Sequence, residues 1–344
     1  MVKWYEKPGS EPDVVISSRI RLARNLSNYP FYGHMTEEQM NRLADDVKAS
    51  LENINLGDNS LSFLSGDELT GYRGMSLVEN HIVSPDFIQD GTGRMLVLSQ
   101  DESISIMVNE EDHIRIQVMT SGLDLDSALE VASKIDDAID ASLNYAFDSQ
   151  LGFLTACPSN LGTGLRASVM LHIPALEKAG SLNRLSGTLS KLGLTMRGTY
   201  GEGTKAVGSL YQISNQITLG ISEEQAIKNL REIVSQIVEK EREAQKALVT
   251  SARFQDRIYR CFGTLKYAKM ISTEEFFELI SDFQIGISRG ILTGSEFQRL
   301  SPERFNCLLF QIGSATLCQK EGRDLTAEER DELRAKIVQE ALKE

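Results

Sequence analysis

Hydrophobic and polar residues alternate with a period of two along much of residues 13–220, a pattern typical of half-buried strands. The alternation predicts strands at VVISSRIRL, RMLVLSQ, SISIMVN, IRIQVM, FLTACP, RASVMLHI, LTMRGTY and SLYQISNQ. Two other segments, TEEQMNRLADDVKASLENI and LDLDSALEVASKIDDAIDASL, repeat apolar residues at helical spacing. Because helices do not separate the strands regularly, the pattern favours an antiparallel or mixed sheet over a doubly wound parallel one.

From about residue 222 the pattern becomes helical. SEEQAIKNLREIVSQIVEKEREAQKAL is expected to form one long amphipathic helix. Further helices are expected to begin at STEEFFELI, TGSEFQRL, SPERFNCLLFQI and LTAEERDELRAKIVQEAL. We therefore predict an α+β domain over residues 1–250, in which helices flank the sheet, and an all-helical domain over residues 251–344.

Composition narrows the class of protein. The net charge of −13 argues against nucleic acid as a partner, since phosphate binding needs concentrated Lys and Arg. No run of residues has the apolar length of a signal peptide or a membrane span, so we expect a cytoplasmic protein without membrane attachment. The four cysteines, Cys157, Cys261, Cys307 and Cys318, lack C-x-x-C spacing, which indicates neither a disulfide framework nor a zinc site.

An acidic cluster interrupts two of the predicted strands. In MVNEEDHIRIQVM, three carboxylates (Glu110, Glu111 and Asp112) separate two alternating apolar runs and are expected at a turn. The strand phase places Asn109 and Arg115 on the polar face of the sheet. Charged residues at such a turn are most often solvated, and the sequence alone leaves the roles of the three acids open.

Arginines occur at positions that suit an anion. Arg19 and Arg21 share one face of a predicted strand, with Ile20 and Leu22 on the other. Two guanidinium groups at alternate positions form a clamp suited to phosphate oxygens, although a basic strand edge that discourages aggregation has the same pattern.

Two glycine-rich loops carry further charged residues. Arg166 follows CPSNLGTG, and Arg197 begins RGTYGEGTK, in which Glu202 is flanked by glycines. Glycines allow backbone N–H groups to approach an anion closely. The segment GTGLRA fits a dinucleotide-binding pattern, but the strand-like RASVMLHI overlaps its end where a helix would be required.

Together these segments resemble the phosphagen (guanidino) kinase family. The matching pieces occur in the family's order: SSRIRLARN, NEEDHIRI, CPSNLGTGLRAS, RGTYGEG and TLGISEEQ. Within the family, the chain is most similar to the bacterial protein-arginine kinases. Only sixteen residues precede Ser17, so the N-terminal helical domain of members with small substrates is expected to be missing. RDELRA, near the C-terminus, matches the phosphoarginine-binding motif of the protein-arginine kinases.

The resemblance implies an antiparallel-sheet catalytic domain that binds ATP with Mg²⁺, with no protein ligand bound directly to the metal. The implied ATP-binding residues are Ser17, Ser18, Arg19, Ile20, Arg21, His81, Arg115, Arg166, Ala167, Ser168, Val169, Met170, Arg197, Gly198, Thr199, Tyr200, Gly201 and Glu202. Glu111 and Glu202 would be the catalytic residues that bracket the substrate guanidinium, and Cys157 would lie against it. Without the resemblance, His81 and Cys157 would be interpreted as structural residues.

The chemistry of the implied reaction accounts for these residue types. Phosphoryl transfer requires positioning and charge neutralisation, which arginines and a metal ion supply. The nucleophile is a guanidinium nitrogen with a pKa above about 12, so it must lose a proton. Two carboxylates can hold the guanidinium and accept that proton. Cys157 is interpreted as a neighbour of the substrate and not as a covalent nucleophile, since its motif holds no histidine.

The C-terminal motif is expected at the start of a helix, because Thr326 and Glu329 form a capping box. The resemblance implies an allosteric phosphoarginine site there, made of Arg330, Asp331, Glu332, Leu333, Arg334 and Ala335. The alternative is an ordinary helix surface with salt bridges between neighbouring turns.

The resemblance thus implies an ATP-dependent protein-arginine kinase that marks proteins for a Clp-type protease. An activating protein partner and a homo-oligomer are also implied. One alternative is a small-molecule arginine kinase. The other is a catalytically inactive adaptor that binds phosphoarginine, against which the intact acids and arginines of the motifs argue.

Overall fold

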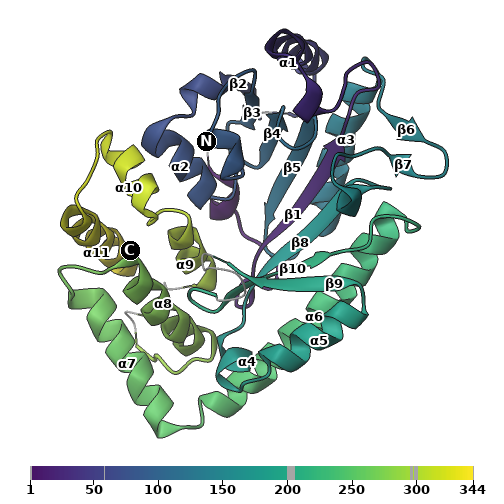
Figure 1. The fold of residues 1–344 in the computed structure, drawn as a ribbon. Helices are drawn as coiled ribbons and strands as arrows, with labels where there is room; N and C mark the ends of the chain where they lie inside the picture. Colours follow the sequence, from purple (N-terminus) through teal and green to yellow (C-terminus); the bar gives the residue numbers. More distant parts are fainter. Residues whose placement is uncertain (1, 58, 200–205, 295–296, 298–300, 344) are drawn as a thin grey trace.

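A computed structural model describes residues 2–57, 59–199, 206–294, 297 and 301–343. An eight-stranded sheet runs through the middle of this part of the chain (Figure 1). Its strands are, in spatial order, β2 (Leu61–Ser65), β3 (Met95–Ser99), β4 (Ile104–Val108), β5 (Ile114–Ser121), β1 (Val15–Arg24), β8 (Leu165–His172), β10 (Leu210–Asn215) and β9 (Leu194–Gly198). Neighbouring strands pair antiparallel, which confirms the predicted sheet type. A separate hairpin joins β6 (Phe147–Asp148) to β7 (Gly152–Phe153).

One face of the sheet forms the main hydrophobic core. Side chains such as Ile20, Ile116 and Val169 are fully buried there, as their alternation with polar residues predicts. Apolar residues of several helices join them, chiefly from α1 (Glu37–Leu51), α3 (Leu125–Asp140) and α6 (Glu223–Leu248). Burying each such Leu, Ile or Val contributes roughly 1.5–3 kcal/mol, so this face fixes the register of the strands.

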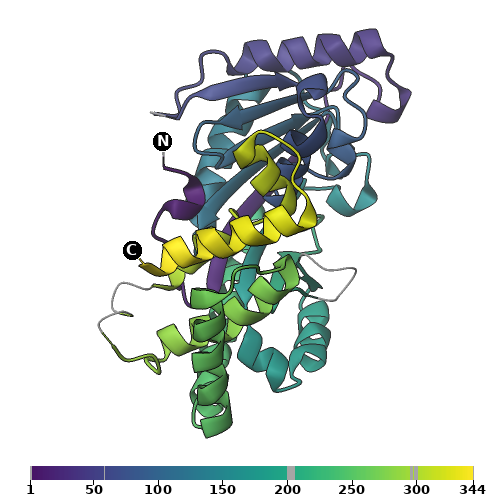
Figure 2. The same cartoon turned by 90° about the vertical axis from the view of Figure 1, so that its left-hand side faces the viewer.

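The C-terminal helices pack against one end of the opposite face (Figures 1 and 2). They are α7 (Ala252–Tyr267), α8 (Thr273–Ser288), α9 (Pro302–Leu309), α10 (Ser314–Glu321) and α11 (Ala327–Lys343). Their buried residues form one cluster with Ile16, Met119 and Met170 of the sheet and with Trp4. The predicted helical C-terminal region is therefore confirmed. A domain boundary near residue 250 stays a prediction, although α6 ends at Leu248 and α7 begins at Ala252.

Helix starts follow the capping residues in the sequence. The hydroxyl groups of Thr36, Ser222, Ser272 and Ser301 each accept a hydrogen bond from the backbone N–H three residues later. Each bond satisfies one of the amide donors that the first turn of a helix leaves free. The predicted starts of α1, α6, α8 and α9 are confirmed within one residue.

Other predictions of local structure are wrong or incomplete. FLTACP is not a strand beyond Phe153, because Leu154 N–H donates to the carbonyl of Ala146 and Ala156 N–H to a carboxylate. The predicted start at TGSEFQRL lies largely outside the described residues. The pattern also missed several helices: α2 (Gly71–Glu79), α4 (Pro174–Lys178), α5 (Leu182–Lys191), α7 and α10. No helix of the described residues is long and apolar enough to cross a membrane.

Candidate active site

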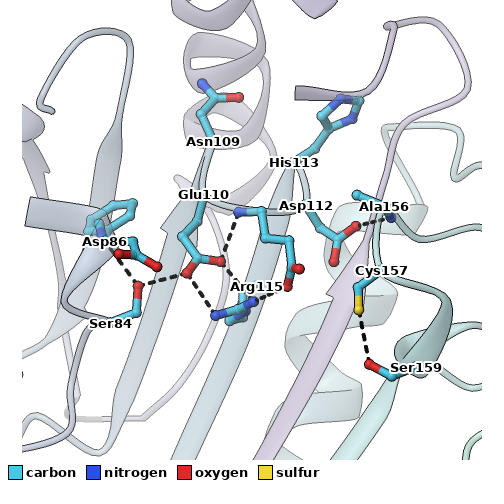
Figure 3. A network of polar contacts seen from close by, with 12 residues as sticks. Ser84, Asp86, Asn109, Glu110, Asp112, His113, Arg115, Ala156, Cys157 and Ser159 are labelled. Atoms are coloured by element: carbon cyan, nitrogen blue, oxygen red, sulfur yellow. Dashed lines mark hydrogen bonds and ion pairs between the residues drawn. The ribbon is translucent and has the colours of Figure 1, made fainter. Parts of the chain in front are cut away.

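Residues 109–113 form the predicted turn between β4 and β5. Asn109 adopts a left-handed backbone conformation (φ 62°), which asparagine tolerates better than most residues. Its side-chain amide donates to the carbonyl oxygens of Met40 in α1 and of Gly93, at 2.9 and 2.6 Å. The prediction that Asn109 shares the polar face with Arg115 is wrong, because this conformation turns its side chain toward α1 (Figure 3).

The three acids of the turn have different surroundings. Glu110 is buried, accepts a hydrogen bond from Ser84 Oγ at 2.7 Å, and forms an ion pair with Arg115 at 2.8 Å (Figure 3). Glu111 is bonded to the same guanidinium at 2.9 Å, but its side chain is 46% exposed. Asp112 is fully buried. A solvated role for Glu110 and Asp112, which the sequence left open, is therefore excluded.

Four arginines gather on the open face of the sheet beside this turn. Arg21 of β1 lies directly opposite Arg166 of β8, and Arg115 of β5 lies opposite Ala23 of β1. Arg19 is two residues from Arg21 on the same face, where its guanidinium donates to Gln212 Oε1 at 2.8 Å. Because alternate residues of β1 face opposite sides of the sheet, these two arginines lie on the open face and Ile20 and Leu22 lie in the core, as predicted.

The electrostatics of this arginine cluster favour an anion. Burial, with Arg166 and Arg115 nearby, lowers the pKa of Arg19 to about 10. Burial also lowers the pKa of Arg21 well below its usual value, and the neighbouring arginines add to the effect. The Nε atoms of Arg21 and Arg166 are buried without a hydrogen-bond partner in the described part of the chain. Phosphate oxygens would satisfy these donors and offset the repulsion.

Two cavities adjoin the cluster and share Arg21 and Arg115. The smaller, about 100 Å³, is lined by Arg21, Ala23, Glu111, Arg115, Ser159, Asn160, Gly164 and Arg166. The larger, about 410 Å³, is lined by Arg19, Arg21, Val78, Glu79, His81, Val83, Ser84, Pro85, Met107, Arg115 and Gln117. The larger cavity has both polar and apolar walls. It lies beside the smaller, charged cavity, whose wall includes the exposed Glu111.

His81 is held in the wall of the larger cavity by its backbone. Its φ is 58°, and its carbonyl accepts a hydrogen bond from Gln117 Nε2 at 2.8 Å. Burial, and secondarily Arg19, lower the pKa of His81 to about 3. The imidazole is therefore neutral at ordinary pH and can pack against a ligand without adding charge to the cluster.

The remaining implied ATP-binding residues lie in several different places. The side chains of Ile20, Ala167 and Val169 lie in the core on the opposite face. Ser17, Ser168 and Met170 are buried at alternate positions on the arginine face, whereas Ser18 Oγ donates to the carbonyl of Gly122. Arg197 and Gly198 end β9, followed by buried Thr199. Tyr200, Gly201 and Glu202 lie outside the described residues.

Cys157 lies in the segment between β7 and β8, two residues before Ser159, which lines the smaller cavity. It is half-buried, and its Sγ lies 3.0 Å from Ser159 Oγ (Figure 3). Ser159 and Asn160 line the smaller cavity together with Glu111. The sequence did not single out Ser84 or Ser159. Ser84 lies in no motif, and Ser159 lies within CPSNLGTGLRAS but is recognised as a site residue only by its contacts in the fold.

The RDELRA motif lies in the first turns of α11. Both hydrogen bonds of the predicted capping box form between Thr326 and Glu329. Arg334 is only 1% exposed and donates to the carbonyls of Ile271 and Ile312 and to Asp331. Arg330 and Asp331 are partly exposed. Arg334 therefore ties α11 to two neighbouring loops, whereas Arg330 can reach a ligand.

Family models match both parts of the chain. Residues 42–244 match the ATP:guanido phosphotransferase, C-terminal catalytic domain, and residues 251–344 match the protein-arginine kinase McsB C-terminal domain. The chain belongs to the ATP:guanido phosphotransferase family, as its motifs predicted.

Its full-length similarity is to protein-arginine kinases. It is 44% identical to the protein-arginine kinase of Halalkalibacterium halodurans over 342 residues, which cover 99% of this chain and 95% of that protein. It is also 44% identical to that of Symbiobacterium thermophilum, covering 99% and 96%. Among solved structures, lombricine kinase has a TM-score of 0.61 at 26% identity, covering 70% of this chain and 69% of that one. The duplicated taurocyamine kinase of Schistosoma mansoni has a TM-score of 0.60 at 27% identity, covering 73% and 37%.

Proposed function

We propose that the chain transfers the γ-phosphoryl group of ATP to arginine side chains of proteins. The observation that carries this proposal is the position of Glu111. It is a partly exposed carboxylate in the wall of a small cavity whose other charged residues are arginines. An anion site and a cation-binding group therefore adjoin each other, as transfer from a phosphate to a guanidinium requires.

The geometry suggests how the two substrates are bound. The phosphates of ATP would lie on Arg19, Arg21, Arg115 and Arg166, and the nucleoside would extend into the larger cavity beside His81. In the structure, the guanidinium of Arg115 forms an ion pair with Glu111. Once phosphate oxygens compete for Arg115, Glu111 is free to accept hydrogen bonds from the substrate guanidinium and to take its proton. By the family resemblance, Cys157 and Glu202 would complete the guanidinium site.

Mg²⁺ would enter together with ATP. Among the described residues, no group of three or more metal-binding side chains is arranged to hold an ion. Mg²⁺ bound with a nucleotide usually keeps several water ligands besides the phosphate oxygens. Glu110 is the buried carboxylate beside Arg115 and is suited to bind one of those waters. The ion would neutralise charge on the transferred phosphoryl group.

Labelling with γ-labelled ATP tests the proposed function. Incubation with an arginine-rich protein should give label that is acid-labile and base-stable, because the product contains a P–N bond. Incubation with free arginine as the only acceptor is the matched comparison. Transfer to free arginine alone would instead indicate a small-molecule kinase. Absence of transfer to both acceptors, with ATP still bound, would indicate an inactive adaptor.

We further propose that RDELRA binds phosphoarginine and is coupled to the nucleotide cavity. Glu79, the last residue of α2, accepts hydrogen bonds from the backbone N–H groups of Ala315 and Thr316 at 2.8 Å, at the start of α10. Glu79 lines the larger cavity of the active site and also a cavity of about 270 Å³ that includes Ile312. Arg334 binds the carbonyl of Ile312. A continuous set of contacts therefore joins α11 to the wall of the nucleotide cavity.

Arg330→Ala should abolish phosphoarginine binding measured by calorimetry, and with it any activation by phosphoarginine. The coupling free energy should be about 1–3 kcal/mol if it resembles other allosteric pairs. Asp331 is left intact because its loss would leave the buried Arg334 without a carboxylate partner. Lys336→Ala, which removes an exposed cation of the same helix outside the motif, is the control. If Arg330→Ala binds phosphoarginine as tightly as the wild type does, the motif serves only as the start of a helix and the proposed site is wrong.

The cellular context is proposed on the family resemblance. It comprises an activating protein, a Clp-type protease that receives marked substrates, a homo-oligomer and a cytoplasmic location. The net charge of −13 suits basic, arginine-containing protein substrates.

A further inference from the structure

Asp112 differs from the other two acids of the turn in what it binds. Its Oδ1 accepts a hydrogen bond from the backbone N–H of Ala156 at 2.7 Å (Figure 3). The same oxygen accepts a second hydrogen bond from Asn25 Nδ2, also at 2.7 Å. It forms no ion pair with Lys, Arg or His in the described part of the chain. A fully buried carboxylate whose Oδ1 receives two short hydrogen bonds is held in one position, while its Oδ2 is buried without a hydrogen-bond partner among the described residues.

Asn25 extends these contacts to a third segment. Its Nδ2 also donates to the carbonyl of Leu154 at 3.0 Å, and its Oδ1 accepts from the backbone N–H of His113 at 2.9 Å. Asn25 directly follows β1, so one side chain connects the end of that strand to the acidic turn and to residues 154–156. Hydrogen bonds of Asn25 and of Asp112 Oδ1 thus join three segments that are distant in sequence: the end of β1, the acidic turn and residues 154–156.

The segment that they hold forms one wall of the site. Beyond Phe153 it pairs with no strand in the described part of the chain, and the N–H of Ala156 is bonded to Asp112 instead. Cys157 follows Ala156 directly, and Ser159 and Asn160 line the smaller cavity together with Glu111. The position of this wall relative to the catalytic carboxylate therefore depends on the Asp112–Asn25 pair.

We propose that Asp112 and Asn25 are positioning residues that fix the Cys157 side of the guanidinium site against Glu111. The inference rests on the proposed arginine-kinase function. It assigns Asp112 a role distinct from those of Glu110 and Glu111, which bind Arg115. Neither Asp112 nor Asn25 touches the substrate. They act through residues 154–160, and their loss should widen the guanidinium site while leaving the arginine cluster intact.

Asp112→Asn is the test variant, because it keeps the shape and one acceptor oxygen but weakens both hydrogen bonds. We expect kcat/KM for an arginine-containing protein to fall by up to about 10²-fold, as small displacements of reacting groups do elsewhere. The loss should appear largely in KM for the protein substrate, with ATP affinity unchanged. Alkylation of Cys157 by iodoacetamide, measured by mass spectrometry of its peptide, should accelerate.

Asp101→Asn is the matched control. Asp101 is also buried and also accepts hydrogen bonds from an asparagine side chain (Asn59, 2.8 Å) and a backbone N–H (Ser103, 3.0 Å). It lies between β3 and β4, at the opposite end of β4 from the acidic turn. This variant should lose stability without changing KM or Cys157 alkylation. If Asp112→Asn gives the same result as this control, Asp112 is structural only and the proposal is overturned.

A measurement on the wild type keeps the proposal testable if Asp112→Asn does not fold. The Ala156 amide lies outside any strand, yet its bond to a buried carboxylate predicts slow hydrogen exchange. Exchange at the rate of an open loop would contradict the proposal. The exchange and alkylation measurements need no turnover, so they separate failure of this inference from failure of the arginine-kinase assignment.

Discussion

Replacing Glu111 by glutamine is expected to lower kcat by about 10²–10⁴-fold, the usual effect of losing a positioned base. The amide keeps the shape of the side chain but can neither accept the guanidinium proton nor hold its positive charge. The larger cavity and most of the arginine cluster do not depend on Glu111, so ATP affinity should change little. Glu202→Gln is expected to have a similar effect on the basis of its motif.

Single-turnover and steady-state kinetics with a protein substrate provide the measurement. Glu278→Gln is a suitable control, because Glu278 is also a partly exposed acid bonded to an arginine, Arg257, at 2.8 Å. It lies in α8, outside both active-site cavities. Near-normal turnover by Glu111→Gln would remove this residue from the mechanism and leave another group as the base.

Replacing Arg115 by alanine should lower kcat by roughly 10³-fold or more, as the loss of an arginine that stabilises a phosphoryl-transfer transition state does elsewhere. Arg115 lines both cavities and binds both Glu110 and Glu111. It is therefore placed where the phosphoryl group must pass from one substrate to the other. Arg197→Ala, at the edge of the second glycine-rich loop, should give a loss of the same order.

The kinetic constants distinguish two roles for Arg115. A loss in kcat shows that the guanidinium stabilises the transition state, whereas a rise in KM for ATP at unchanged kcat would make it a ground-state binder only. Arg260→Ala is the control. Arg260 is 77% exposed and pairs with Asp256 in the same helix, so its removal should leave both constants unchanged.

The sequence predicted those parts of the site that depend on strand periodicity. Arg19 and Arg21 had to share one face because alternate residues of a strand do, and Ile20 had to enter the core. The turn at residues 109–113 followed from two apolar runs on either side of charged residues. These features are local, so a short stretch of sequence contains the physical reason for them.

The roles of the three acids could not be predicted, because residues far along the chain determine them. Asp112 accepts hydrogen bonds from Asn25 and Ala156, and Glu110 accepts one from Ser84. Asn109 was misplaced because alternation does not extend through a left-handed residue. Likewise, nothing near Glu79 in the sequence indicates that it caps a helix more than two hundred residues later.

Trp4 is the one tryptophan of the chain. It is 2% exposed, packs edge-to-face on Phe310 with ring centroids 4.9 Å apart, and belongs to the cluster that joins the sheet to the C-terminal helices. The tryptophan emission of this protein therefore comes from the contact between the sheet and the C-terminal helices. Any ligand that shifts the C-terminal helices against the sheet should change the emission of this indole, so stopped-flow spectroscopy can follow communication between the sheet and these helices without an added label.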